Sequence, residues 1–266
     1  MARCAIIAVV VIIMIGCASR PTPQAVVKPM SEISPQQWAA LSQRHIYFGH
    51  QSVGADIVLG IRDVLAQHPE MSLRLISEPS NTSAGFREFV IGENGNTPSK
   101  NAAFLVKTAA TTDPHPVMMF KYCWADVGRD TDVDAMFRDY RQAVAALRAR
   151  HPDALIVHIT MPLTVVESPR AYLGRRLRGK STRLAANAKR EHYNELMRSQ
   201  FMGEEPFFDL AALESSHADG TREYVSYTGT RVYALAPEWT QDGGHLNAVG
   251  RERVAAQLLI YLATLQ

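Results

Sequence analysis

Cysteine is scarce in this sequence, and so is an excess of charge of either sign. The 266 residues include three cysteines, at positions 4, 17 and 123, and the formal net charge is only +2. No basic stripe runs through an aromatic cluster, and nothing repeats at a fixed period. The lack of a basic stripe argues against nucleic acid as a partner. The lack of repeats argues against a repeat architecture.

The sequence contains enough apolar residues to form a folded core. Hydrophobic residues make up 47% of the chain and charged residues 20%, so disorder is not expected. A length of 266 residues suggests one large domain or two small ones.

The first seventeen residues differ from the rest of the chain. Arg3 precedes an apolar run of about a dozen residues, which is shorter than the roughly 20 that a membrane span needs. This pattern is typical of an export signal. The stretch Met14-Ile15-Gly16-Cys17 resembles a bacterial lipobox, in which cleavage precedes a cysteine that then carries lipid. An ordinary signal peptide with an incidental cysteine is the alternative.

The resemblance to a lipobox implies a signal peptide over residues 1–16 and lipidation of Cys17. Ala18, rather than aspartate, follows the cysteine. By analogy with lipoprotein sorting, this favours anchoring in the outer membrane, facing the periplasm. Residues 17–35 contain four prolines and indicate a flexible tether, which leaves residues 36–266 as a single domain.

Lipid on Cys17 and removal of Cys4 would leave Cys123 as the one cysteine of the mature chain. No intramolecular disulfide could then form, even in an oxidising compartment. The neighbours of Cys123, "MMFKYCWADV", indicate a buried thiol at the end of a strand rather than a nucleophile.

Short apolar segments alternate with longer segments of helical spacing from about residue 36 onward. We expect strands within residues 44–51, 71–78, 115–123, 153–162 and 206–214. We expect helices within residues 54–68, 99–110, 132–151, 181–201 and 247–265, the last with Asn247 as its N-cap. This alternation predicts a three-layer α/β/α sandwich around a mostly parallel, five-stranded sheet.

Parallel sheets of this kind place their ligands at the carboxyl ends of the strands. Ser52 directly follows the first expected strand, between Gly49 and Gly54, at the start of a helix. Near the other end of the chain, Asp242 and His245 lie three residues apart in "DGGHLN". A nucleophile, a base and a group that orients the base are what acyl transfer requires.

This combination resembles the SGNH hydrolases, also called the GDSL esterase/lipase family. In that family the nucleophilic serine follows the first strand, and a D-x-x-H motif precedes the last helix. The resemblance extends from about residue 45 to residue 262 and implies that Ser52, Asp242 and His245 form a catalytic triad. The G-x-S-x-G motif of α/β-hydrolases fits less well, because the first glycine is one position too far from Ser52.

The resemblance also implies an oxyanion hole, and there the sequence departs from the family. The backbone N–H groups of Ser52 and Gly95 are the expected donors, although Asn94-Gly95 is also a strong turn signal. The family's asparagine after the third strand is missing, and "CWAD" stands in its place. Neither Trp124 nor Asp126 is an obvious substitute, since an ionised carboxylate would repel an oxyanion.

Several polar and aromatic residues near these motifs are candidates for binding substrate. They are His50, Gln51, Asn94, Trp124, Asp126 and Trp239. For both tryptophans, packing in the core is an equal alternative. The basic stretch over residues 175–183 is either a solvated loop or a rim that attracts anions. No metal-ligand spacing occurs, and no cofactor is expected.

The lipobox-like stretch and the resemblance to SGNH hydrolases together imply a lipid-anchored serine ester hydrolase of the cell envelope that acts through an acyl-enzyme. Acetylated glycans or lipid esters are the substrates that this location and this family imply. A polysaccharide O-acetyltransferase with the same triad is one alternative. A domain that binds glycan or a partner protein without turnover is another. Nothing in the sequence indicates a particular protein partner.

Overall fold

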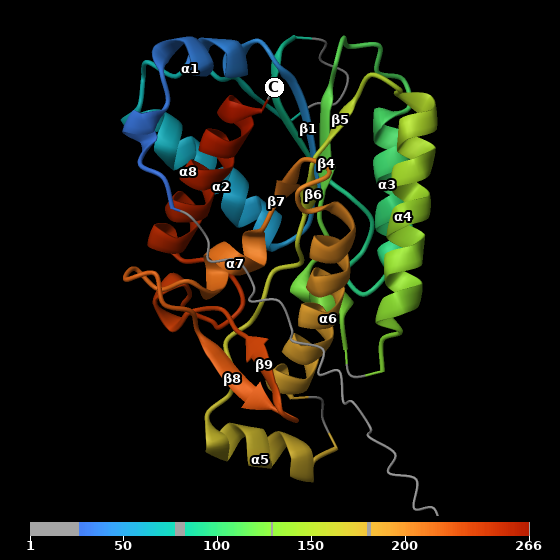
Figure 1. Ribbon diagram of the computed structural model, residues 1–266, viewed down its shortest axis with the longest axis vertical. Coiled ribbons are helices and arrows are strands. Elements are labelled where there is room, and N and C mark those ends of the chain that lie inside the picture. Colours follow the sequence, from blue (N-terminus) through green and yellow to red (C-terminus); the bar gives the residue numbers. More distant parts are fainter. Residues whose placement is uncertain (1–26, 78–82, 129, 180–181, 266) are drawn as a thin grey trace, which may run out of the picture.

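The computed structural model describes residues 27–77, 83–128, 130–179 and 182–265 (Figure 1). The expected signal peptide, residues 1–16, and the expected lipidation site, Cys17, lie outside these ranges. Within the described ranges, no helix is both long and apolar enough to cross a membrane.

A parallel sheet of five strands forms the centre of the molecule. Its strands, in spatial order, are β2 (Leu75–Ile76), β3 (Gly85–Val90), β1 (His45–His50), β4 (Val117–Phe120) and β5 (Leu155–Ile156). All four pairings are parallel. After one further residue, β6 (His158–Ile159) pairs in parallel with β7 (Phe207–Phe208). The expected α/β architecture with a parallel five-stranded sheet is therefore confirmed.

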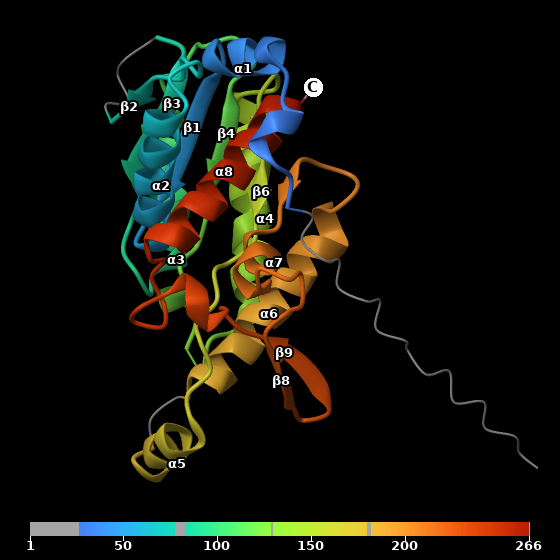
Figure 2. The same ribbon diagram turned by 90° about the vertical axis from the view of Figure 1, so that its left-hand side faces the viewer.

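Helices cover both faces of the sheet and enclose an apolar core on each side (Figures 1 and 2). One core contains side chains of α1 (Pro35–Ser42), α2 (Val53–Gln67), α7 (Leu210–Ser215) and α8 (Ala248–Thr264). The other contains side chains of α3 (Thr97–Thr108), α4 (Val133–Arg150) and α6 (Arg183–Phe201). These three layers agree with the sandwich expected from the sequence.

One strand of the sheet, β3, was not expected from the sequence. Arg87 and Glu88 interrupt its apolar pattern, so the segment gives no strand signal. Both charges have partners inside the fold: Arg87 lies 3.5 Å from the Asp113 carboxylate, and Glu88 lies 2.9 Å from His50. The strand expected at 206–214 is only two residues long, as β7, and continues into α7.

Two long stretches with weak periodicity, about residues 163–182 and 214–241, are expected from the sequence to be loops, but each contains secondary structure. The first includes α5 (Pro169–Leu177), and the second includes the antiparallel hairpin of β8 (Tyr224–Tyr227) and β9 (Thr230–Tyr233). Figures 1 and 2 show both elements projecting beyond the end of the sheet at which β1 finishes. They therefore flank the edge where the sequence places Ser52.

The described end of the expected tether packs on the domain. The backbone of Lys28 exchanges two hydrogen bonds with the side chain of Gln257 on α8, at 2.9 and 2.8 Å. Ile33 is buried in the core beside α1, which begins with a capping box between Ser34 and Gln37. Residues 28–35 are therefore part of the folded domain.

Candidate active site

Ser52 occupies the sharp turn between β1 and α2. Its φ of 50° and ψ of −111° are unusual for a residue with a side chain, and such strain persists only where the surroundings hold it. The side chain of Gln51 donates to the carbonyl oxygens of Ile91 and Gly92, at 3.1 and 2.5 Å. Lys121 Nζ donates to the carbonyl oxygen of Gln51 at 3.2 Å. These contacts fix the turn against both neighbouring strands.

Ser52, His245 and Asp242 form a continuous hydrogen-bonded chain. Ser52 Oγ lies 2.7 Å from His245 Nε2, and His245 Nδ1 lies 2.6 Å from Asp242 Oδ2. An Nδ1–H donated to Asp242 leaves Nε2 as the acceptor for the serine hydroxyl. The three residues thus have the geometry of a nucleophile, a base and an orienting acid.

The carboxylate of Asp242 is well suited to remain ionised. Burial works to raise its pKa, but hydrogen bonds from the His245 N–H, the His245 ring and the Gly244 N–H outweigh it and hold the pKa well below its usual value. Both backbone donors lie 2.8 Å from Oδ1. The acid can therefore stabilise an imidazolium at neutral pH.

The packing of α2 against α8 brings the two motifs together. Ser52 precedes α2, and His245 lies in the loop before α8. Asp56, one turn into α2, accepts a hydrogen bond from the Leu246 N–H at 3.1 Å. A methyl group on Gly60 would lie 2.2 Å from the carbonyl oxygen of Arg251, so the two helices approach very closely. The spacing of the triad is therefore set by this helix pair.

The two expected oxyanion donors are in different situations. Among the described residues, the Ser52 N–H has no acceptor and lies at the N-terminus of α2. The Gly95 N–H donates to Asp126 Oδ1 at 2.8 Å. In this conformation Gly95 is therefore bound to a carboxylate rather than open to a ligand.

Asp126 is the centre of a buried network rather than a group facing a ligand. Its two oxygens accept from Lys100 Nζ, at 2.8 and 2.6 Å, and both side chains of this pair are fully buried. The Cys123 N–H donates to Asp126 Oδ2 at 2.7 Å. Lys100 also donates to the side-chain oxygen of Asn94, at 3.0 Å. The network joins the loop that contains Gly95 to the loop after β4.

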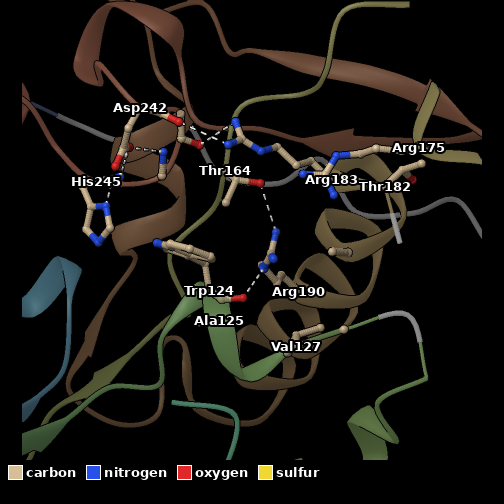
Figure 3. A pocket seen from close by; sticks show the side chains of 14 residues that line it. Trp124, Ala125, Val127, Thr164, Arg175, Thr182, Arg183, Arg190, Asp242 and His245 are labelled. Atoms are coloured by element: carbon tan, nitrogen blue, oxygen red, sulfur yellow. Dashed lines mark hydrogen bonds and ion pairs between the residues drawn. The ribbon is translucent and has the colours of Figure 1, made fainter. Parts of the chain in front are cut away.

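Trp124 lies beside the triad. Its ring meets the His245 ring edge to face, with the centroids 5.7 Å apart. The indole N–H is buried and has no acceptor among the described residues. Figure 3 shows the indole nitrogen on the side of the ring nearer His245. Of the two expected tryptophans, this is the one that borders the site.

The other candidate binding residues are engaged elsewhere. His50 is buried, with its Nε2 2.9 Å from Glu88, and burial lowers its pKa. Trp239 is also buried and donates its indole N–H to the Ser216 carbonyl oxygen at 2.8 Å. Both support the fold behind the site.

A cavity of about 440 Å³ lies on the His245 and Asp242 side of the triad (Figure 3). Its volume is within the range of small-molecule sites, roughly 300–1,000 Å³. Three arginines line it: Arg175, Arg183 and Arg190. The basic stretch over 175–183 indicated the first two, whereas Arg190 gave no signal within its helical segment. The cavity is therefore large enough to hold a small-molecule ligand.

Some residues that shape the site were not expected from the sequence. Lys121 holds the serine turn, Asp56 holds the loop of His245, and Arg190 donates to the carbonyl oxygen of Trp124 at 3.0 Å. Lys121 stands within the apolar run formed by β4 and the residues after it, and this unusual position for a lysine was the available signal.

No family model and no curated protein matches this sequence. Solved structures with a similar fold include a protein described as a GDSL-like lipase, from Parabacteroides merdae. It is 14% identical, the match covers 85% of this chain and 97% of that one, and the TM-score is 0.48. A carbohydrate esterase family 3 protein from Talaromyces cellulolyticus is 14% identical over 82% of this chain and 94% of that one, with a TM-score of 0.45.

The C-terminal domain of the Drosophila Oskar protein is also similar in fold. It is 10% identical, over 88% of this chain and 96% of that one, with a TM-score of 0.43. Similarity at this level concerns the fold alone. The chemistry of the site therefore has to be argued from the residues of this chain.

Proposed function

We propose that the protein is a serine ester hydrolase in which Ser52 forms an acyl-enzyme. The observation that carries the proposal is the chain from Ser52 Oγ through His245 to Asp242, with contacts of 2.7 and 2.6 Å. Three residues from opposite ends of the sequence meet in the order that nucleophilic catalysis requires.

In this mechanism His245 Nε2 accepts the proton of Ser52 as its oxygen attacks the ester carbonyl. Asp242 stabilises the imidazolium that forms. The Ser52 N–H, at the positive end of α2, donates to the oxyanion. His245 then returns the proton to the departing alkoxide, and a water molecule repeats the sequence to release the acid.

The test is covalent labelling of the purified protein with a fluorophosphonate probe, together with hydrolysis of p-nitrophenyl acetate. We expect labelling and turnover in the wild type, and loss of both in Ser52→Ala. Hydrolysis should fall by several orders of magnitude in Ser52→Ala and in His245→Ala, and little further in the double mutant, because the residues act as a unit. A folded wild type that the probe does not label would contradict the proposal and favour a binding domain.

The same acyl-enzyme can pass its acyl group to a sugar hydroxyl instead of water. Analysis of the products formed from an acetyl donor in the presence of candidate polysaccharides separates the two reactions. Free acetate as the main product supports hydrolysis, whereas acetylated polysaccharide identifies an O-acetyltransferase.

We further propose that the protein is exported and anchored by lipid on Cys17, because "MIGC" resembles a lipobox. Cells fed a palmitate analogue should label the wild type but not Cys17→Ser, which should also leave the membrane fraction. Equal labelling of both proteins would rule out this anchor.

A further inference from the structure

We propose that the cavity beside the triad binds a negatively charged group of the substrate, so that the preferred substrate is an anionic ester. This inference rests on the proposed function and specifies its substrate class. It is carried by two arginines, Arg183 and Arg190, which face the cavity without a carboxylate partner among the described residues.

Arg190 projects from α6 into the wall of the cavity (Figure 3). It is only 4% exposed. Its guanidinium donates to three uncharged oxygens: the Trp124 carbonyl at 3.0 Å, the Thr164 hydroxyl at 3.2 Å and the Asn187 amide at 2.5 Å. Burial lowers its pKa to about 10, so it remains protonated at neutral pH. A charge that is so deeply buried is ordinarily paired with an opposite charge.

Arg183 lies at the start of α6 and reaches the loop that contains the triad acid. It donates to the carbonyl oxygens of Asp242 and Gly243, at 3.2 and 3.5 Å. A methyl group on Gly243 would lie 2.1 Å from Arg183 Nη1, so this glycine leaves room for the guanidinium. The second cation is thus next to the triad.

The nearby carboxyl groups do not offset these charges. Asp242 is engaged by His245 and two backbone N–H groups. Glu167 lies 3.5 Å from Arg175 and accepts from the backbone N–H groups of Arg183 and Leu184. Burial raises the pKa of Glu214 to about 8, so that carboxyl is mostly protonated at neutral pH. An incoming anion would therefore supply the missing counter-charge.

The chemistry that fits is a carboxylate or a phosphate, because a guanidinium binds both through paired N–H···O bonds. Thr164 and Trp124 also line the wall. We therefore expect an ester whose acidic group is close to the reacting carbonyl, as in an acylated acidic sugar or a phosphate-bearing glycan.

The first test compares kcat/KM for three acetyl esters that differ only in the alcohol: one neutral, one with a carboxylate and one with a phosphate. We expect one or both anionic esters to be preferred by roughly tenfold or more, because hydrogen bonds between two charged groups are stronger than those between neutral groups. The preference should weaken as salt is added. The better of the two anionic esters identifies the acidic group.

Variants assign the preference to the cavity. Arg183→Gln should reduce the ratio of anionic to neutral kcat/KM about tenfold. Arg190→Lys keeps the positive charge, so it should retain more of the ratio of anionic to neutral kcat/KM than Arg190→Gln. It also provides a variant at this position if Arg190→Gln does not fold. Arg141→Gln removes the same charge from an exposed position on α4 and should leave the ratio unchanged.

Binding provides a readout that is independent of turnover. Inorganic phosphate should raise the melting temperature of Ser52→Ala, and the shift should shrink when Arg183→Gln is added. Equal kcat/KM for the three esters, or a phosphate effect that survives Arg183→Gln, would overturn the inference. If the protein hydrolyses none of the esters but still binds phosphate through Arg183, the proposed function is rejected and the anion site is supported.

Discussion

Asp126 illustrates how the surroundings of a residue decide its role. From the sequence it is a candidate for binding substrate, because it stands close to the position of the family's asparagine. In the structure its carboxylate is fully buried against Lys100 and also accepts the N–H groups of Gly95 and Cys123. The hydrogen-bonding capacity of Asp126 is thus used within the protein.

We predict that Asp126→Asn destabilises the fold, because it leaves the Lys100 ammonium buried without a counter-charge. Breaking a buried ion pair in this way costs about 3–5 kcal/mol. Urea denaturation of the variant measures the loss. Asp134→Asn is the matched control, since Asp134 is exposed on α4 and pairs with His192, which is also exposed, at 3.3 Å. A loss for Asp126→Asn no greater than that of the control would contradict the buried pair.

The three side chains of the hydrogen-bonded chain, Ser52, His245 and Asp242, are candidates from the sequence, whereas the residues that support them are not. Ser52, Asp242 and His245 stand in motifs whose place relative to strands and helices is visible in the pattern. Lys100 and Arg190 lie on helices among other polar residues, where a charge is ordinarily solvent-exposed. Their burial depends on which face each helix turns inward, and that is a result of tertiary packing.

At the level of helices and strands, the contact between α2 and α8 determines the geometry of the site. Gly60 allows this contact, because its missing side chain leaves room for the backbone of Arg251 and the side chain of Ala255. Ser52 lies at one end of α2, and His245 precedes α8. A change in the distance between the helices therefore also changes the distance between nucleophile and base.

We predict that Gly60→Ala lowers both the free energy of unfolding and esterase activity. Alanine gains about 1 kcal/mol in helix propensity. Its methyl group, however, would lie 2.2 Å from a backbone oxygen, and overpacking of this kind costs about 1–3 kcal/mol. A shift of about 1 Å at the triad can reduce the rate roughly 100-fold.

The control for Gly60→Ala is Gly174→Ala in α5, where the nearest atom to the new methyl group would be 3.4 Å away. Denaturation and kinetic assays of both variants separate packing from propensity. If Gly60→Ala were as stable and as active as the control, the helix contact could not be what sets the site.

The elements that could not be predicted from the sequence are those whose local residue pattern does not reflect their place in the fold. β3 contains two charged residues that are paired inside the fold, so it lacks the apolar run of a buried parallel strand. The β8–β9 hairpin and α5 are short and largely exposed, and their strand or helix periodicity is correspondingly weak. The long helices, in contrast, bury a full stripe of side chains, so the spacing of their apolar residues predicts them.

For the molecule as a whole, the buried acid Glu214 makes stability depend on pH. Its pKa is raised by burial from 4.5 to about 8, so the folded state holds a proton that the unfolded chain releases. The associated stability is fully present below pH 4.5 and is lost as pH rises through about 8. We predict that Glu214→Gln becomes progressively more stable relative to the wild type between pH 5 and pH 9.

Urea midpoints of the two proteins at several pH values measure this difference. The comparison isolates Glu214, because all other titrating groups are common to both proteins. Parallel profiles across the range would contradict the raised pKa.

The pairing of α2 with α8 also has a consequence for how the protein comes into being. Ser52 and His245 are 193 positions apart, and α8 is the last helix within the described residues. A ribosome therefore delivers α2, with its apolar face, long before the helix that covers it. Contacts between such distant segments form slowly, and the uncovered face is prone to aggregation while it waits. The proposed active site would therefore be among the last parts of the molecule to assemble.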